Sequence, residues 1–121
     1  MNKKTLVLGA SDNTNRYSYL AILRLRNAGH DVVGIGKRHG FAADVEIETK
    51  PVPIPDLDTI TLYLNPFHQR PYYDYMLSLK PRRIIFNPGT ENPQFIEKLE
   101  AAGIYPEIAC TLVLLATGQF E

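Results

Sequence analysis

The chain lacks several features that would assign it to a specialised class of protein. Its single cysteine, Cys110, excludes an intrachain disulfide and a cysteine-based zinc site, and His30, His39 and His68 lack the spacing of a metal-binding pair. No stretch approaches the ~18 apolar residues of a membrane-spanning helix, and the apolar run Thr5–Ala10 is too short for a secretion signal. Lys and Arg together number 13, as do Asp and Glu, so there is no basic excess for coating nucleic acid. We therefore expect a soluble, cytoplasmic protein that binds neither nucleic acid nor membranes and holds no metal.

The chain also lacks any linker, internal repeat or low-complexity run that would divide it. Its 121 residues are the length of one folded domain, and 45% hydrophobic and 21% charged residues are ordinary globular values. We expect a single domain over residues 1–121.

The absence of net charge hides an asymmetry along the chain. Residues 1–40 carry seven basic and two acidic side chains, whereas residues 41–121 carry six basic and eleven acidic ones. A bound anion is therefore expected in the first third of the chain.

Several short runs have the length of β-strands. Val45–Thr49 alternates apolar with acidic residues and predicts a half-exposed edge strand, and Ile104–Ala109, which contains Pro106, predicts another edge strand. Four further runs are more continuously apolar or β-branched, as in parallel strands buried on both faces: Thr5–Gly9, Asp31–Gly36, Thr59–Leu64 and Arg83–Asn87.

The segments between these runs predict helices. Ser18–Asn27 and Pro71–Leu79 are two of them, and a third begins at Asn92 and Pro93, a capping residue followed by proline at the first helical position, and stops at Gly103. Alternating strands and helices predict an α/β fold with three αβα layers and a mostly parallel, doubly wound sheet of five or six strands.

The loop after the first predicted strand is the most informative segment. Ligands of open α/β sheets bind beyond the carboxyl ends of the strands, and a helix N-terminus there suits a phosphate. Gly9 permits close backbone approach, Ser11, Thr14 and Ser18 offer hydroxyls, and Arg16 offers a two-pronged phosphate contact. The alternative is that Gly9 only makes the turn and Ser18 only caps the helix.

Two phosphate-binding signatures are missing from this loop. It has neither the Gly-X-Gly-X-X-Gly of dinucleotide-binding domains nor a Gly-Lys-Ser/Thr P-loop, so we expect no ATP hydrolysis of the P-loop type. At the end of the second predicted strand, Lys37 and Arg38 stand where an NAD enzyme places an acid for the ribose. These cations would attract a ribose phosphate, as in NADP or coenzyme A (CoA); the alternative is a solvated basic loop.

Motifs along nearly the whole chain, taken in order, resemble those of the stand-alone CoA-binding domain proteins. These are small bacterial Rossmann-like proteins similar to the CoA-binding domain of the succinyl-CoA synthetase alpha subunit. The motifs that carry the resemblance are Val7–Ser11 with Arg16, Ala28–Lys37, Asp58, Phe86–Thr90 and Ala101–Cys110.

The resemblance implies a small-molecule nucleotide ligand, CoA or an acyl-CoA, more than an activity. It implies that Gly9, Ala10, Ser11 and Arg16 hold the CoA phosphates and that Lys37 faces the 3′-phosphorylated adenosine. The chain departs from the family at Asn65-Pro66, where an arginine is common. An NADP-binding oxidoreductase or redox sensor is the alternative function, and a protein-interaction subunit with a vestigial pocket is a third.

Together these arguments predict a set of cofactor-binding residues in the loops that follow the strands. They are Gly9, Ala10, Ser11, Asp12, Thr14, Arg16, Tyr17, Ser18, Gly36, Lys37, Arg38, Asn65, Pro66, His68, Asn87, Pro88 and Gly89.

No catalytic site is evident. Polar or reactive side chains at the predicted strand ends are the candidates, but no two of them have the sequence spacing of a known catalytic motif. They are His39, Asn65, His68, Asn87, Thr90 and Cys110. We expect Cys110, which precedes a very apolar tail, to be a small core residue. Tyr72 and Tyr75 would share a helix face and pack on the sheet while Tyr73 points away; the alternative is that these tyrosines flank an adenine ring. The apolar run 112–116 either covers the sheet edge as a helix or meets a partner, a second copy or another protein.

Overall fold

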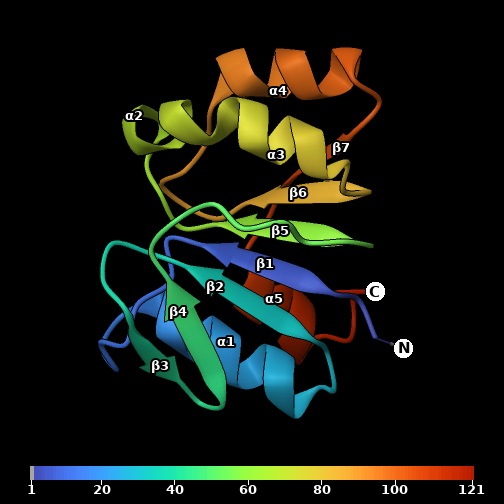
Figure 1. Ribbon diagram of the computed structural model, residues 1–121. Coiled ribbons are helices and arrows are strands. Elements are labelled where there is room, and N and C mark those ends of the chain that lie inside the picture. The colour runs from blue at the N-terminus through green and yellow to red at the C-terminus, as the bar shows by residue number, and fades with distance from the viewer. Residues whose placement is uncertain (1) are drawn as a thin grey trace.

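The computed structural model describes residues 2–121 and contains one sheet of seven strands. The order across the sheet is β3-β4-β2-β1-β5-β6-β7, and all neighbours are parallel except β3 and β4 (Figure 1). From the central β1 the chain winds first to one side and later to the other, so the predicted doubly wound, Rossmann-like fold class is confirmed. The strands are β1 (Thr5–Leu8), β2 (Val32–Ile35), β3 (Gly40–Ala42), β4 (Val45–Glu48), β5 (Thr59–Leu62), β6 (Arg83–Phe86) and β7 (Tyr105–Ile108).

Helices cover both faces of the sheet (Figure 1). In the part of the chain that the structure describes, no helix has the length and hydropathy needed to cross a membrane. The helices are α1 (Tyr17–Asn27), α2 (Pro66–Gln69), the 3₁₀ turn η1 (Arg70–Tyr72), α3 (Tyr73–Leu79), α4 (Pro93–Ala101) and α5 (Thr111–Ala116).

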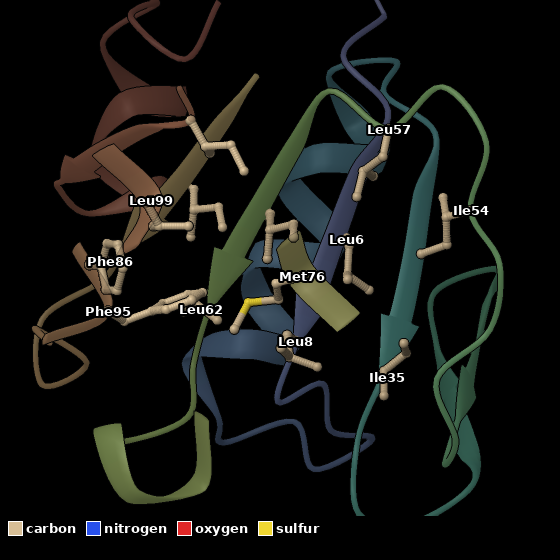
Figure 2. Packing of buried hydrophobic residues seen from close by; sticks show 13 residues of the cluster. Leu6, Leu8, Ile35, Ile54, Leu57, Leu62, Met76, Phe86, Phe95 and Leu99 are labelled. Atoms are coloured by element: carbon tan, nitrogen blue, oxygen red, sulfur yellow. The ribbon is translucent and has the colours of Figure 1, made fainter. Parts of the chain in front are cut away.

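Two apolar clusters fill the space between the sheet and its helices. On one face, Met76 of α3 and Phe95 and Leu99 of α4 pack against strand residues such as Leu6 and Leu62 (Figure 2). On the other face, helices α1 and α5 contribute their apolar sides to a second cluster. All four residues of β1, β5 and β6 are buried, as expected for central parallel strands covered on both faces.

The sheet has seven strands, one more than the five or six predicted, and the additional strand β3 occupies the edge that was predicted for Val45–Thr49. The three residues of β3 pair antiparallel with β4, so the predicted Val45–Thr49 edge strand lies between β3 and β2. A tight turn through Ala43, with φ of 54°, brings β3 back along β4. A three-residue strand that begins with glycine carries no periodic signal, which is why the sequence did not reveal it. The other predicted edge, β7 with Pro106, is indeed the last strand.

The predicted Pro71–Leu79 helix is only the second half of a longer helical path. That path begins at Pro66, because Asn65 Oδ1 accepts the backbone N–H of His68 at 3.0 Å and caps α2. The predicted start of α4 is confirmed, since Asn92 Oδ1 accepts the N–H of Phe95 at 3.1 Å.

The apolar run 112–116 forms most of α5 and packs on a face of the sheet beside α1, not at its edge. Leu114 is buried there, whereas Val113 keeps 54% of its surface exposed. A partner for this segment stays a prediction.

Candidate functional site

A cleft of about 780 Å³ opens where the carboxyl ends of β4, β2, β1, β5 and β6 meet. Its size lies within the roughly 300–1,000 Å³ of small-molecule sites, and it lies where the winding of the sheet reverses, the usual ligand position in this class of fold. Apart from Thr49, two groups of residues line it. The basic wall, from the ends of β1 and β2, comprises Gly9, Ala10, Ser11, Asp12, Arg16, Tyr17, Ser18, Ile35, Gly36, Lys37 and Arg38. The β5–β6 wall comprises Tyr63, Leu64, Asn65, His68, Pro71, Tyr72, Pro88, Gly89 and Thr90.

All but three of the predicted binding residues line this cleft; the exceptions are Thr14, Pro66 and Asn87. That any of the predicted residues binds a ligand stays a prediction. Tyr63 and Leu64 follow β5 directly, as Gly9 and Ala10 follow β1, so their position after a strand was the signal that could have found them. The lining residues that the prediction missed are Ile35, Thr49, Tyr63, Leu64, Pro71, Tyr72 and Thr90.

The backbone of the basic wall is packed closely enough to require glycine. Gly9 has a φ of +97°, in the left-handed region that favours glycine. A Cβ on Gly36 would lie 2.1 Å from the carbonyl oxygen of Ala10. The N–H groups of Gly9 and Ala10 both donate to the Ile35 carbonyl, at 2.8 and 2.9 Å. These two N–H groups are therefore already engaged, and Gly9 and Ala10 shape the wall without offering them to an anion.

Helix α1 begins at this wall without a capping side chain. Its N-cap residue is Arg16, whose side chain accepts no hydrogen bond from the first turn, and the alternative role of Ser18 as the cap is wrong because Ser18 lies inside that turn. The first turn contains no acidic residue. The positive end of the helix dipole thus lies at the cleft, beside Arg16, Tyr17 and Ser18.

Three cations of the basic wall are exposed and unpaired. Within residues 2–121, Arg16, Lys37 and Arg38 form no ion pair. By contrast, Arg26 binds Asp44 through two hydrogen bonds of 2.9 Å, and this contact lowers the pKa of the Asp44 carboxyl. The positive charge at the cleft is therefore available to a ligand.

Asp12 is the one acidic residue in the lining of this cleft. Its carboxylate lies against Gly40, where an added Cβ would meet Oδ2 at 2.6 Å. The absence of a side chain at Gly40 lets the segment with Lys37 and Arg38 approach the loop after β1.

The β5–β6 wall is braced from behind by a buried side-chain network. Gln69 is fully buried, and its Nε2 donates to the carbonyls of Leu64 and Thr90, both at 2.8 Å. Its Oε1 accepts from Asn92 Nδ2 at 2.8 Å, which also donates to the Tyr73 hydroxyl at 2.7 Å. This network fixes two backbone segments that line the cleft.

Asn87, predicted to contact the ligand, belongs to the interior of the fold. It is 2% exposed, and its Nδ2 donates to Thr61 Oγ1 and the Leu62 carbonyl at 2.6 and 2.8 Å. Its Oδ1 accepts the N–H of Thr111 at 2.8 Å. The amide therefore anchors the start of α5 to β5, which explains why it does not line the cleft.

Tyr63 reaches from the cleft towards α5. Its hydroxyl is buried near Thr61 and Thr111 without a hydrogen bond of standard geometry. Burial, reinforced by nearby Cys110, raises the pKa of Tyr63 to about 12. The hydroxyl therefore stays protonated at neutral pH and is not a base.

Cys110 is a free, half-exposed residue at the N-cap of α5, outside both apolar clusters and outside the cleft lining. The expectation of a core cysteine was wrong because the apolar tail buries only one side of α5.

The predicted tyrosine arrangement is partly wrong. Tyr73 does not point away; its ring stacks on Phe95 at a centroid distance of 4.2 Å. The Tyr75 hydroxyl donates to the Val52 carbonyl, and Tyr72 lines the cleft. The helical path that starts at Pro66 and includes a 3₁₀ turn places these residues differently from a regular helix.

Of the remaining polar residues at the strand ends, Asn65, His68 and Thr90 line the cleft, whereas His39 does not. His39 Nε2 contacts Glu46 Oε2 at 2.6 Å outside the cleft lining. Across residues 2–121 there is no cluster of three or more His, Cys, Asp or Glu side chains that could hold a metal ion.

The fold and the cleft define a doubly wound α/β domain suited to a phosphorylated ligand. Residues 3–116 match the family model of the CoA binding domain, and the chain belongs to that family. A crystal structure of an uncharacterized protein, 49% identical, superimposes with a TM-score of 0.96 and covers 99% of both chains.

Two archaeal proteins share the fold at lower identity. A hypothetical protein from Pyrococcus horikoshii OT3 is 18% identical, with a TM-score of 0.85 over 99% of this chain and 85% of its own. A conserved hypothetical protein from Pyrococcus furiosus is 22% identical, with a TM-score of 0.80 over 92% of this chain and 97% of its own. A search of curated proteins finds no match to the chain.

Proposed function

We propose that this protein is a binding module that holds CoA in the cleft at the carboxyl ends of the strands. One observation carries the proposal: Arg16, Lys37 and Arg38 line one wall of the cleft beside the uncapped start of α1, and none of them forms an ion pair within residues 2–121. Membership of the CoA-binding domain family supports CoA as the phosphorylated ligand.

The wall offers two groups of contacts for the phosphates. Arg16, together with the hydroxyls of Ser11 and Ser18, faces the pyrophosphate in this proposal, and Lys37 and Arg38 face the 3′-phosphate of the adenosine. Hydrogen bonds between charged groups contribute about 1.5–3 kcal/mol each when partly shielded from water. Two such groups of contacts would distinguish CoA from nucleotides that carry only a pyrophosphate.

We assign no reaction to the module itself. Asn87 is occupied inside the fold, and Cys110 and His39 lie outside the lining. Its proposed role is to hold CoA for sensing or for delivery to a partner.

A thermal-shift titration tests the ligand. A ligand that binds only the folded state raises the melting temperature in proportion to the logarithm of its concentration over Kd. We expect CoA to stabilise the protein more than dephospho-CoA, which lacks the 3′-phosphate, and more than NAD. Stabilisation by NADP without stabilisation by CoA would contradict the proposal and favour the oxidoreductase alternative.

A further inference from the structure

The side chain of Asn65 has a defined orientation at the start of α2. Its Oδ1 accepts the backbone N–H of His68 at 3.0 Å, and a backbone N–H can only donate. The oxygen and nitrogen of an asparagine amide are similar in size and are assigned from their hydrogen bonds. Because the His68 N–H needs an acceptor, it identifies the amide atom that it contacts as the oxygen. The atom that faces His68 is therefore the amide oxygen.

The same oxygen determines the tautomer of the His68 ring. Oδ1 lies 3.1 Å from His68 Nδ1, and because an amide oxygen only accepts, Nδ1 carries the proton. In the neutral ring the proton on Nδ1 leaves Nε2 as an acceptor. The Phe67 ring meets the imidazole edge to face at 5.4 Å and restricts it further. Nε2 has no partner within residues 2–121, and His68 lines the cleft.

His68 lies on the β5–β6 wall, across the cleft from the phosphate contacts. The proposed pyrophosphate contacts follow β1, which lies one strand spacing, ~4.8 Å, from β5, and the proposed 3′-phosphate contacts follow β2, one spacing further. The pantetheine arm of CoA contains two amides and has the length of roughly four extended residues, about 14 Å. The arm is therefore long enough for a CoA molecule whose pyrophosphate lies at the basic wall to place its thiol beside His68.

We propose that His68 Nε2 accepts a hydrogen bond from the thiol of bound CoA, so that the cleft prefers free CoA to its thioesters. This inference rests on the proposed function. A free thiol is a donor, although a weak one, whereas a thioester has no S–H to offer. Asn65 acts through the ring and is a positioning residue.

Calorimetric titration at neutral pH with CoA, desulfo-CoA and acetyl-CoA tests the preference. We expect the wild-type protein to bind CoA about threefold or more tighter than either analogue, the gain typical of one modest hydrogen bond. In His68→Leu this ratio should fall to about one while binding of desulfo-CoA is kept. His39→Leu, a matched change of a histidine outside the lining, should keep the wild-type ratio.

Two substitutions of Asn65 test the positioning. Both substitutions should reduce the preference: Asn65→Ala removes the acceptor for Nδ1–H, and Asn65→Asp adds a carboxylate that favours the doubly protonated ring, whose Nε2 can only donate. A purely structural role of Asn65 would change all three affinities together and leave their ratio unchanged.

The outcomes separate the two proposals. Equal binding of CoA and desulfo-CoA by the wild type, tighter binding of acetyl-CoA, or an unchanged ratio in His68→Leu overturns the role of His68 and leaves CoA binding standing. No binding of any of the three ligands overturns the proposed function, and the role of His68 with it.

Discussion

The two walls of the cleft are built in opposite ways. The basic wall presents exposed side chains, Arg16, Lys37 and Arg38, that are unpaired among the described residues, on a backbone held together by close contacts at glycines. The β5–β6 wall is supported by buried polar side chains, Gln69 and Asn92, whose hydrogen bonds are satisfied inside the fold. Buried polar groups must be paired to avoid a desolvation penalty, whereas exposed charges stay solvated until a ligand arrives.

Other arginines of the chain are held in ion pairs, although the exposed Arg24 forms none within residues 2–121. Arg82 binds Asp58 through two hydrogen bonds of 2.9 and 3.1 Å, and the nearly buried Arg83 binds Glu107 at 3.0 Å. The contrast teaches that ligand contacts on the basic wall should be separable from stability, and that changes behind the β5–β6 wall should act on stability first.

The largest expected loss of stability follows from a substitution that disturbs the backbone of the basic wall. Gly36→Ala places a Cβ 2.1 Å from the Ala10 carbonyl, and backbone cannot move aside as a side chain can. We expect a loss of about 3 kcal/mol in the free energy of unfolding, measured by urea denaturation. Gly40→Ala, which meets only the movable Asp12 carboxylate, should cost less than about 1 kcal/mol. A loss in Gly36→Ala no larger than the small loss expected for Gly40→Ala would show that the close approach at Gly36 does not require glycine.

The next largest expected loss of stability follows from disrupting the buried hydrogen bonds of Gln69 behind the β5–β6 wall. Gln69→Leu leaves the Leu64 and Thr90 carbonyls without their donor and should lower the free energy of unfolding by about 2 kcal/mol. The control is Gln94→Leu, at an exposed position of α4, which should change it by less than about 0.5 kcal/mol. A Gln69→Leu protein as stable as the wild type would contradict the claim that buried hydrogen bonds behind the β5–β6 wall contribute to stability.

Arg16→Ala tests whether the ligand contacts are separable from stability. We expect CoA affinity to fall about tenfold or more, because charge-assisted hydrogen bonds to a phosphate are lost. Stability should change by less than about 0.5 kcal/mol, since Arg16 forms no ion pair with any residue that the structure describes. Calorimetry with Arg24→Ala, an exposed arginine further along α1, gives the control. Similar losses of affinity in the two variants would indicate a diffuse field, screened beyond about 8 Å, and not a phosphate site at Arg16.

The smallest effect is expected at Cys110, which lies outside both walls. Cys110→Ala should leave CoA affinity within about threefold and stability within about 1 kcal/mol, because the side chain is only half-buried. Thiol labelling of the native protein should proceed equally with and without CoA. If CoA slowed the labelling of Cys110, this residue would contact the ligand and would have to be counted among the residues that line the cleft.

Local patterns in the sequence predicted most of the fold. The continuous apolar runs predicted the buried strands, and the Asn92-Pro93 start signal predicted α4, because burial and capping depend on neighbouring residues in the chain. The short strand β3 escaped prediction because its pairing with β4, and not its composition, makes it a strand.

For the cleft, the sequence by itself determined which loops contribute, since the ends of parallel strands meet at one edge of a sheet. It also identified the basic side chains there. Only the tertiary structure decided which polar groups face the cleft and which are used inside the fold. Asn87 and His68 both follow strands as polar residues, yet Asn87 is engaged by Thr61 and Thr111, whereas Nε2 of His68 has no partner in the described part of the chain. The reason is physical: a buried polar group must find its partner among residues distant in sequence, and only packing brings those residues together.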